Sequence, residues 1–131
     1  MHNPARPLSP HLQVYRRQVQ MVTSILHRAT GIVLSLGSLL IAAGLIALAS
    51  GATSWDSLRN CAASWFGLIV LIGWSWALAF HLINGIRHLL QDAGWGYAIS
   101  TFVRNSWISV IGSLLLTVAI WGVVISRGGF A

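Results

Sequence analysis

The stretch ATGIVLSLGSLLIAAGLIALASGATSW, residues 29–55, contains no Asp, Glu, Lys or Arg. Two further charge-free stretches follow at residues 61–86 and 105–126. A membrane-spanning helix needs roughly 20 mostly apolar residues, so each stretch is long enough for one crossing. The sequence therefore predicts an all-α membrane protein with three transmembrane helices. The predicted spans are at about residues 25–50, 63–90 and 105–126.

The composition excludes the common soluble classes. Hydrophobic residues make up 56% of the 131-residue chain and charged residues only 8%, with neither Lys nor Glu present. A soluble domain carries about a quarter charged residues, and disorder requires high charge with low hydrophobicity. The net charge of +6 comes from Arg residues at the ends of apolar runs, not from a patch interleaved with aromatics. We therefore expect a lipid membrane as partner and no nucleic acid.

The chain divides into an N-terminal arm and a membrane domain. Residues 1–20 are polar and contain all three Pro residues, which favour extended backbone, so we expect an extended cytoplasmic arm. No apolar signal sequence precedes the first span, which predicts that the N-terminus stays on the side of synthesis. Residues 21–131 form the predicted three-helix domain, with Ser54 as a candidate N-cap for a short helix over residues 55–62.

The distribution of Arg predicts the orientation. With the N-terminus in the cytoplasm, that side carries six Arg: Arg6, Arg16, Arg17, Arg28, Arg87 and Arg104. The other side carries two, Arg59 and Arg127. Cytoplasmic segments carry the Arg and Lys excess, so we expect the N-terminus inside and the C-terminus outside.

A first polar group lies at the start of the first span, in SILHRATG, residues 24–31. On a helix, Ser24, His27 and Arg28 share one face with Gly31. A hydroxyl, an imidazole and a guanidinium placed together can bind a carbonyl or a carboxylate. The alternative is that Arg28 only anchors the helix by reaching toward lipid headgroups.

A second polar group lies at the end of the second span, in HLINGIRHLLQD, residues 81–92. Its members His81, Gly85 and His88 fall on one helical stripe. His81 lies inside a charge-free stretch, where an ionisable residue is costly and suggests function. A neutral imidazole is a good axial ligand for haem iron, and Gly85 would let a flat macrocycle approach the backbone. The alternative is a histidine satisfied by an interhelical hydrogen bond.

The two polar groups are expected on the same side of the membrane. The propionates of a haem held by His81 would point toward His27 and Arg28, whose charges suit carboxylates. His88 is nearer the interface and suits a propionate better than iron. The chain offers no obvious second axial ligand, so a six-coordinate haem would need a histidine from another chain.

Three motifs in register resemble those of the cytochrome b subunit of succinate dehydrogenase, the haem-binding membrane anchor of respiratory complex II. They are RPLSPHLQVYR at residues 6–16, SILHRATG at residues 24–31 and HLINGIRHLLQD at residues 81–92. The resemblance runs from about residue 6 to residue 100. The third span is similar only in its hydrophobic character.

The resemblance implies a haem b shared with a small membrane-anchor subunit, which supplies the second axial ligand and completes the helical bundle. It implies that His81 is the axial ligand, that His27 contacts a propionate, and that Ser24 and Arg28 belong to a ubiquinone-reduction site. It also implies iron–sulfur and flavoprotein subunits on the cytoplasmic or matrix face. The chain would then be a multi-pass protein of a bacterial or mitochondrial inner membrane, and not an enzyme by itself.

Three alternatives come from other functions. A proton-coupled transporter would need a carboxylate inside a span, but Asp56 and Asp92 are both predicted outside the spans. A cofactor-free membrane assembly protein would lack haem absorption. A fumarate reductase anchor would share the motifs, since the direction of turnover cannot be predicted from them.

Overall fold

The computed structural model describes residues 16–129, which form four helices and no strand. The helices are α1 (Val19–Ala49), α2 (Ala52–Ala63), α3 (Trp65–Asp92) and α4 (Ile99–Ser126). The helices α1, α3 and α4 are each long and apolar enough to cross a membrane. This confirms the predicted all-α fold with three transmembrane helices. Most of the predicted arm, residues 1–15, lies outside the described residues.

The short helix α2 begins earlier than predicted, and Ser54 is not its N-cap. Gly51 precedes the helix with φ of 115°, a conformation that L side chains rarely adopt. The helix then starts at Ala52, so Ser54 lies within its first turn. A genuine side-chain cap occurs one helix later, where the Ser64 hydroxyl accepts a hydrogen bond from the Gly67 N–H at 3.1 Å.

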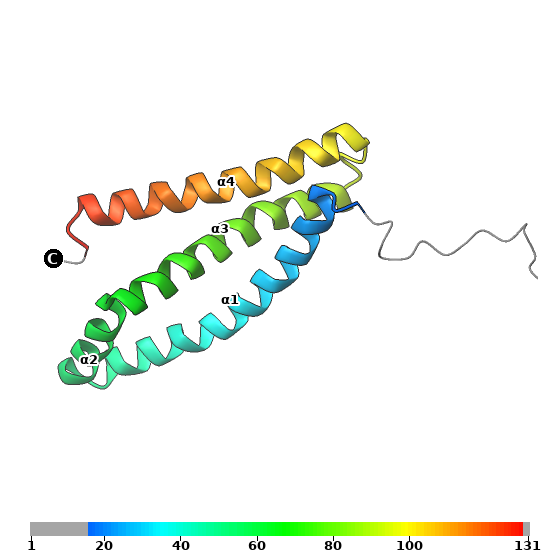
Figure 1. Cartoon of the computed structure of the whole chain (residues 1–131). Coiled ribbons are helices and arrows are strands. Elements are labelled where there is room, and N and C mark those ends of the chain that lie inside the picture. The colour runs from blue at the N-terminus through cyan, green and yellow to red at the C-terminus, as the bar shows by residue number, and fades with distance from the viewer. Residues whose placement is uncertain (1–15, 130–131) are drawn as a thin grey trace, which may run out of the picture.

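The three long helices converge at one end of the molecule and spread apart toward the other (Figure 1). The start of α1, the end of α3 and the start of α4 meet at the converging end. The central helix α3 packs against both α1 and α4, whereas α1 and α4 share a smaller contact. The converging end also carries the helical residues Arg28, Arg87 and Arg104, because the helices extend beyond the charge-free stretches.

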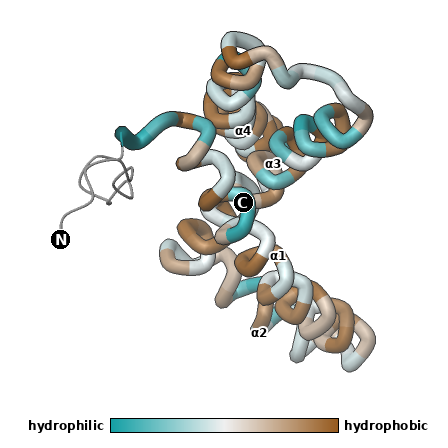
Figure 2. The backbone as a smooth tube through the Cα atoms, turned by 90° about the vertical axis from the view of Figure 1, so that its right-hand side faces the viewer, coloured by the Kyte–Doolittle hydropathy of each residue, from teal (hydrophilic) through white to brown (hydrophobic). Residues whose placement is uncertain are grey.

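Among the described residues, small and polar side chains fill the interior, and large apolar side chains cover the outside. The buried apolar residues are Ala77, Ala79 and Phe80. The buried polar residues are Thr23, Thr30, Asn84, Arg87, Gln91, Ser106, Ser109, Ser113 and Thr117. In Figure 2 the brown of hydrophobic residues runs along all three long helices. Such an inverted distribution suits lipid, where helices associate by close packing and interhelical hydrogen bonds.

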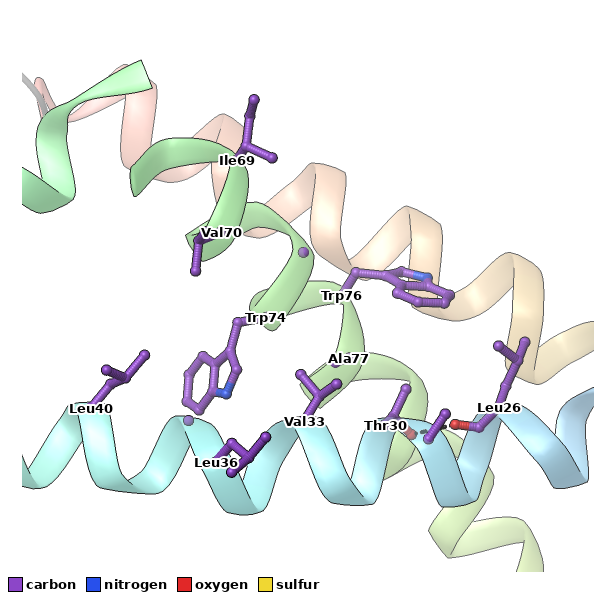
Figure 3. Close-up of a pocket in the computed structure, with 13 residues that line it drawn as sticks. Leu26, Thr30, Val33, Leu36, Leu40, Ile69, Val70, Trp74, Trp76 and Ala77 are labelled. Atoms are coloured by element: carbon purple, nitrogen blue, oxygen red, sulfur yellow. Dashed lines mark hydrogen bonds between the residues drawn. The ribbon is translucent and has the colours of Figure 1, made fainter. Parts of the chain in front are cut away.

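Close approach of α1 and α3 depends on a glycine. Gly37 is buried, and a Cβ added there would overlap the indole ring of Trp74 on α3. Figure 3 shows the Trp74 ring directed toward α1, between Leu36 and Leu40. Gly37 therefore provides the space that lets a large aromatic side chain pack against the helix backbone.

Candidate functional site

The two predicted polar groups meet between α1 and α3. The ring of His27 stacks on the ring of His81, with centroids 3.9 Å apart and planes 12° apart. The ring of His88 lies 5.0 Å from His27 at 49°. The structure thus brings together the three histidines that were predicted as site residues, His27 on α1 and His81 and His88 on α3.

Among residues 16–129, the ring of His81 forms its hydrogen bonds through Nδ1 only, and they reach across to α1. Its Nδ1 lies 3.1 Å from the carbonyl oxygen of His27 and 3.2 Å from Oγ1 of Thr30. A carbonyl oxygen can only accept, so Nδ1 carries the proton and donates it. In the neutral imidazole, Nε2 then keeps its lone pair and can bind a metal. The interhelical hydrogen bond of the alternative interpretation is therefore present, and it leaves the second nitrogen available.

Two glycines, Gly31 on α1 and Gly85 on α3, lie against the stacked rings. A Cβ added to Gly31 would lie 3.1 Å from Cε1 of His81, closer than nine in ten real Cβ contacts. A Cβ added to Gly85 would lie 3.7 Å from Cε1 of His27, which is ordinary contact. Of the two, Gly31 is the one whose missing side chain lets the imidazole of His81 approach α1.

An apolar, open-sided pocket of about 630 Å³ lies between α1 and α3, and Thr30 is one of its lining residues. Figure 3 shows its walls, which are formed by α1 residues such as Val33 and α3 residues such as Ala77. Two indole N–H groups, of Trp74 and Trp76, are buried and have no hydrogen-bond partner in the part of the chain that the structure describes. Thr30 connects the two features, because its hydroxyl faces Nδ1 of His81 and the residue also lines this space, which suits an apolar ligand; His81 itself is not a lining residue.

Ser24 and Arg28 lie on α1 close in sequence to the stacked rings. Ser24 is half-buried and Arg28 is exposed. Within residues 16–129, neither side chain forms a hydrogen bond or an ion pair. A hydroxyl and a guanidinium with all their donors available remain free to bind a ligand or a partner chain.

The environment of Arg87 was not predicted from the sequence, where this residue counted only as a charge at the membrane edge. Arg87 is 5% exposed and lies between three helices. Its Nη1 donates to Oδ1 of Asn84 at 2.8 Å and to Oγ1 of Thr23 and Oγ of Ser106, each at 3.2 Å. The guanidinium also lies 4.7 Å from the ring centroid of Phe102. The spacing of Phe80, Asn84, Arg87 and Gln91 on one face of α3 could have indicated this burial.

The fold and the site together define a class: a membrane protein of three crossings that holds a cluster of histidines and a buried arginine at one end of its bundle. Within that class, the model of the succinate dehydrogenase/fumarate reductase transmembrane subunit matches residues 2–120. The chain belongs to this family. It is therefore a multi-pass inner-membrane protein and a non-flavin subunit of an oxidoreductase complex.

Relatives from bacteria and mitochondria support this assignment. The chain is 42% identical over 113 residues to the succinate dehydrogenase cytochrome b556 subunit of Paracoccus denitrificans, covering 86% of this chain and 87% of the relative. The cytochrome b556 subunit of Rickettsia felis is 39% identical over 116 residues, with 88% and 90% covered. The mitochondrial cytochrome b560 subunit of Sus scrofa is 34% identical over 117 residues, with 88% and 69% covered.

Proposed function

We propose that this chain is the cytochrome b subunit of a succinate dehydrogenase, that it binds haem b through Nε2 of His81, and that it helps to form the site of ubiquinone reduction. The observation that carries the proposal is the hydrogen bonding of His81, whose Nδ1 is held by α1 while Nε2 keeps its lone pair. Metal-bound histidines commonly donate their other ring N–H to a backbone carbonyl.

The residues around His81 fit a haem. An apolar pocket that would suit a flat macrocycle is lined by Thr30, whose hydroxyl faces His81, and Gly31 lets the His81 ring lie close to α1. Nδ1 of His27 is buried and has no hydrogen-bond partner among the described residues, so this ring can serve a propionate. Arg28 and His88 complete the polar end. When bound, a haem would supply one-electron transfer in the membrane.

Ser24 and Arg28 are the residues that we assign to ubiquinone. Arg28 is a permanent cation with charge-assisted donors, and Ser24 adds a hydroxyl four residues earlier on the same helix face. Reduction of a quinone builds negative charge on its oxygens. A guanidinium placed there would stabilise that charge, and the hydroxyl would orient the carbonyl.

A six-coordinate haem iron takes two axial ligands, and His81 would be the one that this chain provides. We assign the second axial ligand to a small membrane-anchor subunit. We place an iron–sulfur subunit and a flavoprotein subunit on the cytoplasmic or matrix face, next to Arg28.

The test uses the whole complex purified in mild detergent. His81→Leu should remove or shift the visible haem band. Arg28→Leu should lower succinate-driven quinone reduction by roughly 100-fold, the scale of losing one donor to a developing oxyanion. Succinate oxidation with a soluble dye should persist in both variants. Arg59→Leu, an exposed arginine on α2, is the matched control and should leave quinone reduction unchanged.

Three results would contradict the proposal. An unchanged haem spectrum in His81→Leu would remove the ligand assignment, and a complex without any haem absorption would favour a cofactor-free assembly protein. If Arg28→Leu lost dye reduction together with quinone reduction, the whole complex would be impaired, and this would count against a specific role of Arg28 at the quinone. The family also includes fumarate reductase subunits, so turnover in both directions should be measured in the same preparation.

A further inference from the structure

We infer that Thr30 is a positioning residue for the haem ligand, holding His81 in its Nδ1-protonated form and fixing the direction in which Nε2 points. The inference rests on the proposed function, because it assigns a role to Thr30 only if His81 binds iron. It concerns a residue that the motif analysis did not select.

The hydroxyl of Thr30 is itself held in place. Its Oγ1 donates within α1, lying 2.8 Å from the carbonyl oxygen of Leu26 and 3.0 Å from that of His27. A hydroxyl has one proton and two lone pairs, so Oγ1 faces Nδ1 of His81 as an acceptor at 3.2 Å. Thr30 is 3% exposed, and no water is needed to complete this arrangement.

Thr30 is one of two acceptors for the same N–H. The other is the carbonyl oxygen of His27, 3.1 Å from Nδ1. The neighbouring Gly31 admits the ring to this position, since a Cβ there would lie 3.1 Å from Cε1. The imidazole therefore contacts three features of one helical turn of α1: the carbonyl oxygen of His27, the hydroxyl of Thr30 and the position of Gly31, which has no side chain.

The expected consequence is electronic. A hydrogen bond from Nδ1–H raises the basicity of Nε2 and so strengthens its binding to the more positive, oxidised iron. Losing the Thr30 acceptor should weaken binding of the oxidised form more than that of the reduced form. The midpoint potential should then rise.

The experiment compares Thr30→Val, Thr30→Ala and Thr30→Ser in the purified complex. The midpoint potential and the haem-to-protein ratio are measured from the visible band. We expect Val and Ala to raise the potential by a roughly three- to tenfold change in relative affinity, where tenfold is about 59 mV for one electron. Ser keeps the hydroxyl and should stay near wild type.

The matched control is Thr117→Val on α4. Thr117 is also buried, and its hydroxyl donates to the carbonyl of Ser113 at 2.8 Å, without contact to a histidine. This variant should leave the potential unchanged. Val keeps the shape of Thr, whereas Ser keeps its hydroxyl. If Thr30 acted only through packing, Thr30→Val would therefore have the wild-type midpoint potential.

Several outcomes would overturn the inference. A Val variant with the wild-type potential, or a Ser variant that shifts as far as Ala, would show that the hydroxyl does not act on His81. If Thr30→Val fails to assemble, the comparison of Ser with Ala decides the same question. Wild-type potentials in all Thr30 variants, with haem lost in His81→Leu, would overturn this inference and leave the proposed function standing.

Discussion

At the scale of single residues, the Gly at position 31 lets the imidazole of His81 lie close to the backbone of α1. The ring of His81 lies over this glycine, and its Nδ1 reaches the carbonyl oxygen of His27 at 3.1 Å. A hydrogen bond weakens steeply as distance and angle depart from their preferred values. Small displacements of the ring should therefore be visible in any property that depends on His81.

We predict that Gly31→Ala shifts the haem band and lowers haem retention, while the complex still assembles. The added Cβ would lie 3.1 Å from Cε1 of His81, so the ring must move by a few tenths of an ångström. The measurement is the visible spectrum and the haem-to-protein ratio after extended washing. Gly122→Ala on α4 is the control, because an added Cβ there meets nothing within 4 Å and the residue does not line the pocket. Equal spectra for both variants would show that Gly31 is not needed for the approach.

The histidines could be predicted from sequence because they are costly in a span and share helix faces. The hydrogen-bond acceptors of His81 could not be predicted from the sequence. One is the backbone carbonyl of His27, which no side-chain pattern reveals. The other is Thr30, whose hydroxyl also bonds to a carbonyl of its own helix, as Ser and Thr hydroxyls in helices commonly do. Only the packing of α1 on α3 distinguishes Thr30 from an ordinary helical threonine.

At the scale of helices, Arg87 joins α3 to both of its neighbours. Its Nη1 contacts Thr23 on α1 and Ser106 on α4, and its shortest hydrogen bond, 2.8 Å, goes to Asn84. No described Asp or Glu neutralises it. A buried cation without a carboxylate depends on every dipole around it, so removing one partner should cost more than an ordinary hydrogen bond.

We predict that Asn84→Leu lowers the stability of the complex by about 1.5–3 kcal/mol, the range for a hydrogen bond to a charged group. Adding Arg87→Met should recover part of that loss, because the unpaired charge disappears as well. The measurement is a double-mutant cycle of thermal unfolding in detergent. Purely additive effects of the two substitutions would show that Asn84 does not stabilise Arg87.

The number and type of the long helices could be predicted because length and hydropathy decide them. Their packing faces could not be predicted so readily. One stripe of α4 is buried and consists of Ser106, Ser109, Ser113 and Thr117. In the sequence, these four hydroxyl residues look like ordinary polar interruptions of an apolar run. In a membrane the apolar side chains face outward, so the usual rule that hydrophobic periodicity marks the core is reversed.

At the scale of the whole molecule, the outer surface must be covered by something other than water. Large apolar side chains on α1, α3 and α4 are exposed, including Ile25, Leu39 and Leu115. Lipid covers such surfaces, and partner helices cover them where a site is shared. The converging end differs, because Arg28 and the histidines gather there.

This asymmetry bears on orientation. Arg28, Arg87 and Arg104 all lie toward the end where α1 begins, while α2, with Arg59, lies at the opposite end. Arg87 is buried, so it adds less to the accessible charge than the sequence count assumed. Leaving it out still gives five Arg on the N-terminal side against two on the other. The excess of Arg on the N-terminal side therefore remains when the buried Arg87 is left out.

We predict from this excess that the N-terminus and the connection at residues 93–98 face the cytoplasm, and that α2 and the C-terminus face outward. In a bacterial host, alkaline phosphatase should be active when fused within α2 or after residue 129, and inactive when fused at residues 93–98. A fluorescent protein that matures only in the cytoplasm should give the opposite pattern. Phosphatase activity at residues 93–98 would invert the topology. It would also place the histidines and Arg28 at the outer surface, away from the side on which we locate the iron–sulfur subunit.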